Sequence, residues 1–148
     1  MVRGVLGVVI GGIVWMPVFF ILAWLPASVW PDYARSGATW FDAGVYTFTA
    51  SMSVLNAVLW LVASIVAGWL AALVARRREA AWALAVLVML YMCFNHLYYF
   101  WDRFPWWYNL VVALPSGPAV LLGGRLARRW SRLGRRAAAA APVTDERG

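Results

Sequence analysis

The sequence is short of charged and metal-binding residues. Only 13% of its 148 residues are charged, about half the share of a typical soluble domain, so a water-soluble enzyme is excluded. The one cysteine, Cys93, cannot form an internal disulfide. The one histidine, His96, cannot form an intrachain histidine cluster around a metal ion. Lysine is absent, so every basic residue is arginine.

Long apolar runs dominate what is present. A helix that crosses the hydrocarbon core of a bilayer needs about 20 apolar residues. Four stretches qualify, at about 5–25, 51–75, 80–101 and 106–122. The runs are continuous rather than alternating, which favours helices over a β-barrel. We therefore predict an all-α, polytopic membrane protein whose residues 1–123 form a bundle of four transmembrane helices.

The connections between these runs differ in length. Short polar turns at 76–79 and 102–105 place consecutive helices antiparallel to each other. Pro26 and Pro31 are expected to end the first helix. The long outer loop, 26–50, is rich in aromatic residues and is predicted to be a loop or short helix at the membrane interface.

The arginines are distributed unequally between the two sides of the predicted bundle. Only Arg35 and Arg103 fall on one side, and the remaining arginines fall on the other. The positive-inside rule then places both termini in the cytoplasm. The abundance of alanine, arginine and glycine suggests a GC-rich bacterial genome, and hence the bacterial inner membrane. The net charge of +7 is thus attributed to topology, and no nucleic-acid partner is expected.

The basic tail, 124–148, carries apolar residues at helical spacing. This pattern predicts an amphipathic helix on the cytoplasmic leaflet, and the alternative is a solvated basic tail. The residues after Pro142 are expected to be disordered. Anionic lipid headgroups are the expected partners of six arginines, Arg125, Arg128, Arg129, Arg132, Arg135 and Arg136.

Two prolines lie within the fourth predicted helix. Pro115 and Pro118, with Gly117 between them, predict a bend or an unwound turn between Leu114 and Ala119. Broken membrane helices can form ion or substrate sites, but a kink absorbed by neighbouring helices is the favoured interpretation.

The best candidate pocket is a polar cluster at the outer end of the bundle. An ionisable residue inside a membrane span indicates a functional site by default. The favoured alternative is that His96 belongs to an interfacial aromatic belt, with Trp101, Trp106, Trp107 and Tyr108 as anchors. The candidate pocket residues are Asn56, Asn95, His96, Tyr99, Asp102 and Asn109.

Small residues recur at helical spacing in the first two runs. Ser64, Gly68 and Ala72 repeat every four residues, and Gly4, Gly7 and Gly11 crowd one side of the first run. Such patterns allow helix backbones to approach closely, within one chain or between two.

The stretch from His96 to Asn109, HLYYFWDRFPWWYN, resembles the hairpin between the third and fourth helices of small, uncharacterised bacterial inner-membrane proteins. This resemblance implies four helices and no known activity. Similar sequences often carry a second histidine where this chain has Asn109, which weakens any metal-binding interpretation.

The leading functional hypothesis is an accessory or scaffold subunit of a larger membrane complex or a homo-oligomer. It rests on the absence of nucleophile, zinc and phosphate-binding motifs and on the abundant surface for helix contacts. We expect no catalysis, no cofactor and no metal. The alternative is a small transporter, channel or lipid- or quinone-binding protein that uses the outer polar pocket around His96.

The arginine distribution generates a topology prediction. Reporter fusions after Gly148 and within 36–39 should report cytoplasmic and periplasmic locations, respectively. A periplasmic reporter at the C-terminus would contradict this orientation.

Overall fold

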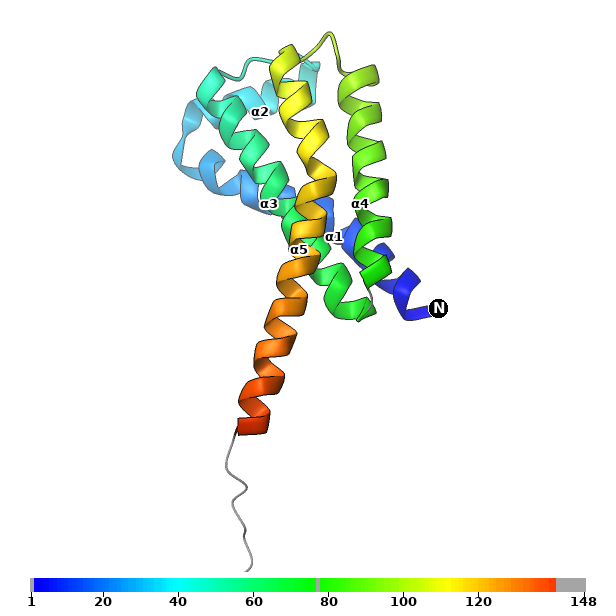
Figure 1. Ribbon diagram of the computed structural model, residues 1–148. Helices are drawn as coiled ribbons and strands as arrows, with labels where there is room; N and C mark the ends of the chain where they lie inside the picture. The colour runs from blue at the N-terminus through cyan, green and yellow to red at the C-terminus, as the bar shows by residue number, and fades with distance from the viewer. Residues whose placement is uncertain (1, 77, 141–148) are drawn as a thin grey trace, which may run out of the picture.

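The computed structural model describes residues 2–76 and 78–140, and every regular element in these ranges is a helix (Figure 1). The elements are α1 (Val2–Val29), α2 (Pro31–Ala43), α3 (Ala50–Ala75), α4 (Arg78–Cys93), the π-helix η1 (Phe94–Tyr99) and α5 (Trp106–Ala140). The predicted all-α class is confirmed.

Four helical segments are long and apolar enough to cross a membrane. They are α1, α3, the continuous stretch Arg78–Tyr99, and Trp106–Ser131 of α5. The chain is therefore a multi-pass membrane protein. We call the end of the bundle that carries Arg76, Arg78 and Arg125 the arginine end. The opposite end, with α2 and the turn 100–105, is the aromatic end.

The first helix is longer than predicted. It runs through Pro17 and Pro26 to Val29, so Pro26 does not end it. Each proline removes one backbone donor, a loss that membrane helices tolerate. Pro31 instead occupies the first turn of α2, where the missing N–H has no partner to lose. The segment 26–50 thus contains a helix of 13 residues, which ends at Gly44 in the left-handed conformation.

The fourth span and the first part of the basic tail form one helix. α5 passes through Pro115 and Pro118 as continuous helix, so the unwound turn predicted there is not found. The Ser116 hydroxyl donates to the Ala113 carbonyl at 2.7 Å within this stretch. α5 also continues without interruption from 123 into 124, and both glycines pack closely against neighbouring helices. The predicted disorder after Pro142 lies outside the described residues.

At the arginine end, α3 and α5 touch through their backbones. A Cβ atom on Gly68 would overlap the Val120 carbonyl, and one on Gly123 would overlap the Ile65 carbonyl. α1 joins the same end, since a Cβ on Gly7 would lie 2.7 Å from the Ala71 carbonyl oxygen. Most of the small residues singled out in the sequence therefore pack helices within one chain. Gly4 is the exception, with nothing within 4 Å of a Cβ.

At the aromatic end the helices separate. α1 contacts α4 where Gly11 meets Leu84 and where the Trp15 and Tyr91 rings lie 5.6 Å apart. Beyond that point α1 slants away from α4, and α2 returns across the gap (Figure 1). The bundle is thus a wedge that is tight at the arginine end and filled by larger side chains at the aromatic end.

The backbone contact predicts unequal effects of two glycine substitutions. Gly68→Ala should lower the free energy of unfolding by about 1–3 kcal/mol, because the new methyl group overlaps the backbone of α5. Gly12→Ala is the matched control, since its Cβ would meet only a Leu84 methyl at 3.9 Å. Thermal unfolding in detergent compares them, and equal midpoints for the two variants would refute the contact.

Candidate ligand pocket

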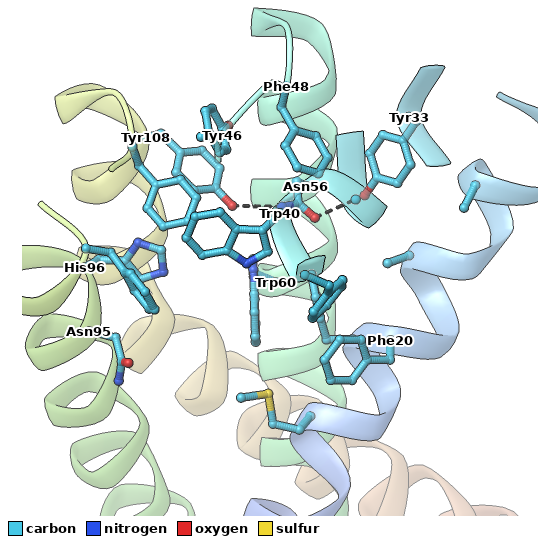
Figure 2. A pocket seen from close by; sticks show the side chains of 18 of the residues that line it. Phe20, Tyr33, Trp40, Tyr46, Phe48, Asn56, Trp60, Asn95, His96 and Tyr108 are labelled. Atoms are coloured by element: carbon cyan, nitrogen blue, oxygen red, sulfur yellow. Dashed lines mark hydrogen bonds between the residues drawn. The ribbon is translucent and has the colours of Figure 1, made fainter. Parts of the chain in front are cut away.

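A large cavity, open at its rim, lies near the aromatic end of the wedge. Its volume is about 510 Å³, which is within the range of small-molecule pockets. α1, α2, α3, α4, η1 and the start of α5 all contribute side chains to its lining. Figure 2 shows its open centre, with His96 and Asn95 on one side and Phe20 and Trp60 on the other.

Aromatic rings form the floor of this cavity. Phe19 of α1 stacks on Trp60 of α3, with centroids 3.7 Å apart and planes 10° apart. Directly below, the Trp15 indole N–H donates to the Ser64 hydroxyl at 3.0 Å. Because Trp15, Phe19 and Ser64 are buried, the floor separates the cavity from the tight arginine end.

α2 forms the roof. Its Trp40 ring packs against Phe100 at 5.5 Å and Phe104 at 4.7 Å, which joins the roof to the turn between η1 and α5. The Arg103 guanidinium lies beside Gly44, the C-cap of α2, where a cation stabilises the carbonyl end of a helix.

A chain of hydrogen bonds centred on Asn56 crosses the upper part of the pocket. The Tyr33 hydroxyl donates to Asn56 Oδ1 at 3.1 Å, and Asn56 Nδ2 donates to the Tyr108 hydroxyl at 3.0 Å (Figure 2). Burial, and then the nearby Tyr46, raise the pKa of the Tyr33 phenol, so its proton remains available to donate. Asn56 therefore joins α2 to α5 through α3, and its amide is already occupied.

Tyr46, in the segment between α2 and α3, adds a second polar contact to the wall. Its hydroxyl is hydrogen-bonded to the hydroxyl of Ser53. Burial raises the pKa of the Tyr46 phenol, and so this side chain is neutral at physiological pH.

The π-helix explains why His96 faces inward. The buried residues of α4 include Leu84, Val88 and Met92, and His96 continues this row at the same spacing of four. In an α-helix such a row drifts by about 40° at each step and would leave the core. The wider turn of η1, closed by the Phe100 N–H donating to the Asn95 carbonyl at 2.7 Å, reverses this drift.

Asn109 fixes the orientation of the histidine ring. Asn109 Nδ2 donates to the carbonyls of Trp101 at 3.2 Å and Phe104 at 3.4 Å. Its Oδ1 therefore faces His96 Nδ1, 3.0 Å away, and this nitrogen must carry a proton. In the neutral ring the other nitrogen, Nε2, is then a hydrogen-bond acceptor. Within the described part of the chain, Nε2 has no partner.

The structure corrects several assignments made from sequence. His96 is only 6% exposed and bonded to Asn109, so it is not part of an interfacial belt. Tyr108 is 1% exposed and is not a belt anchor either. Tyr99 and Asp102 are exposed and do not line the cavity: Tyr99 ends the π-helix, whose register differs from that of an α-helix, and Asp102 lies in the turn beyond it.

The remaining candidates divide between the cavity and its support. Asn56 and Asn95 line the cavity with His96, while Asn109 is fully buried behind the histidine. Asn95 Nδ2 donates to the Tyr91 carbonyl at 2.8 Å. Its amide oxygen has no hydrogen-bond partner among residues 2–76 and 78–140, so it is a second free acceptor.

The lining is apolar and uncharged. Among the described residues, no aspartate, glutamate, lysine or arginine lines the cavity. The side chains at the rim that are exposed on the bundle surface are also apolar or aromatic: Phe20, Trp24, Ala38, Phe41 and Tyr91. The described residues contain no group of three histidine, cysteine or acidic side chains that could hold a metal ion.

Sequence reasoning missed most of the aromatic walls. Tyr33 and Trp40 were assigned only to an interfacial segment, and Phe19 and Trp60 resemble ordinary lipid-facing residues. Asn56 was the visible signal, since it is a polar side chain within a long apolar run. Comparison with protein-family models, curated proteins and solved structures finds no match for this chain.

The support of His96 by Asn109 predicts a stability difference. Asn109→Leu should lower the free energy of unfolding by about 1–3 kcal/mol, because His96 Nδ1 and two carbonyls lose their buried partner. Asn95→Leu is the matched control, because it removes only a hydrogen bond to the Tyr91 carbonyl four residues earlier. It should lower the free energy of unfolding by less than Asn109→Leu does. Unfolding midpoints in detergent measure both, and an equal loss would contradict the role assigned to Asn109.

Proposed function

We propose that this protein binds a neutral amphipathic molecule in the cavity, with a hydroxyl-bearing head near His96 and a hydrocarbon tail that extends toward the lipid. The unpartnered Nε2 of His96 inside a pocket of about 510 Å³ is the observation that carries this proposal. This observation favours ligand binding, which was the alternative hypothesis from the sequence. The accessory or scaffold role remains a prediction.

The free polar atoms determine the chemistry of the head. His96 Nε2 and Asn95 Oδ1 both accept hydrogen bonds and lie on adjacent residues of η1. A phenol or alcohol can donate to them. An oxidised quinone, whose carbonyls only accept, matches them less well. A charged head is disfavoured because the lining of the cavity carries no opposite charge to compensate for its desolvation.

The walls determine the rest of the ligand. Aromatic side chains such as Trp40 and Trp60 offer flat apolar surfaces to a ring or an unsaturated chain. The apolar rim, with Phe20 and Trp24 on α1 and Tyr91 on α4, would let a hydrocarbon tail leave the cavity between these helices. The ligand would then enter sideways from the membrane and not from water.

The proposal is tested with a pair of ligands that differ only in donor capacity. A tritiated long-chain 4-alkylphenol and its methyl ether are titrated against the full chain in phosphatidylcholine nanodiscs. The phenol should bind about 5- to 10-fold more tightly, the range expected for one hydrogen bond inside a pocket. His96→Phe should remove this preference while keeping an aromatic ring of similar size.

Two further variants separate recognition from general damage. Tyr98→Phe is the matched control, because Tyr98 lies in the same π-helix, is 76% exposed and does not line the cavity. This variant should prefer the alkylphenol over the methyl ether as strongly as the wild-type protein does. Ala23→Phe introduces a ring into the cavity and should weaken both ligands together. Equal binding of phenol and ether to the wild-type protein would overturn the proposal.

A further inference from the structure

A separate hollow lies at the arginine end, between the first turn of α4 and the middle of α5. It measures about 10 Å³, room for one water or one ligand oxygen atom. Its lining combines three arginines from two helices with three apolar residues: Arg78, Arg125, Arg128, Ala81, Trp82 and Leu121.

Arg128 contributes an unpaired donor to the lining of this hollow. Its Nη1 atom is fully buried yet has no hydrogen-bond partner among the described residues. The side chain folds back over Gly124, since Nη1 lies 3.7 Å from where a Cβ of that glycine would be. An unpaired, buried guanidinium N–H is unfavourable, and an oxyanion is the group that best satisfies it.

The surroundings also favour negative charge. Arg78 and Arg125 are exposed at the edge of the hollow, so their guanidinium groups remain free to reach an anion from the surface. Arg78 begins α4, and the free backbone N–H groups of a helix N-terminus attract anions. In the described residues, the one salt bridge is between Asp32 and Arg35 in α2, so no carboxylate there occupies these arginines.

We propose that Arg128, Arg125 and Arg78 bind a phosphate oxyanion, supplied by the phosphodiester of an anionic membrane lipid. One phosphate oxygen enters the hollow and accepts from Arg128 Nη1, while the exposed arginines contact the others. Arg78 opens a membrane-spanning segment, and Trp82, half exposed beside it, is a residue type that anchors at headgroup depth. This site is independent of the ligand pocket at the aromatic end.

Native mass spectrometry of the full chain in a neutral detergent tests the proposal, with phosphatidylglycerol as the lipid probe. The wild-type protein should retain one phosphatidylglycerol molecule, and Arg128→Gln should weaken its binding about tenfold, as expected for the loss of a charge-assisted hydrogen bond. Arg3→Gln is the matched control, because Arg3 carries the same charge, lies in α1 at the same end of the bundle and is exposed outside the hollow. Its affinity should stay within about twofold of wild type.

Further arms separate the lipid from its alternatives. Millimolar inorganic phosphate should not displace the lipid, and displacement would assign the site to a free phosphate and overturn the lipid as its source. Equal losses in Arg128→Gln and Arg3→Gln would show non-specific charge attraction and overturn the site. Should Arg128→Gln fail to give a monodisperse protein, Arg125→Gln serves as the test, because it removes an exposed arginine of the same hollow. An unchanged affinity in that variant would also overturn the proposal.

Discussion

The contact between the backbones of α3 and α5 sets the geometry of the whole bundle. At Gly68 and Gly123 no side chain separates the two helices, whereas at the aromatic end the bonded side chains of Asn56 and Tyr108 lie between them. Two rods that touch at one end and are held apart at the other must diverge. The cavity lies beside this junction, where α1 slants away from α4 and α2 closes the gap (Figure 1).

The helices stay apart at the aromatic end because hydrogen bonds between polar side chains connect them there. The Tyr33–Asn56–Tyr108 chain connects three helices, and the His96–Asn109 bond connects η1 to α5. In an apolar environment an unpaired amide or hydroxyl is costly, so these bonds specify which faces meet as well as adding stability. At the surface, Arg103 lies beside the C-cap of α2 and stabilises the end of this helix.

The four spans could be predicted from sequence because the length and hydropathy of a run are local properties. The prolines at 17, 26, 115 and 118 were harder to interpret, since whether a helix continues through a proline depends on the packing around it. Asn109 was among the residues expected near His96, but the contacts that the imidazole ring makes could not be derived. They depend on a π-helix that has no clear signature in the sequence, and the walls depend on α2 folding back over α1. Asn56 and Asn109 were identified as polar outliers, but their different roles, bridge and support, emerge only from the contacts.

The π-helix also has an evolutionary consequence. A π-turn is an α-helix that accommodates one additional residue within a turn, and such turns often arise where an insertion has been kept for function. A chain one residue shorter in 94–99 could continue as a plain α-helix: the residues after the deletion would keep their places in the bundle, while the residues within this turn would change the direction in which they face. The gain or loss of a single codon could thus create or abolish the inward histidine while leaving hydropathy and the number of spans unchanged. Two relatives of this protein could share the same membrane topology and still differ in whether they bind a ligand.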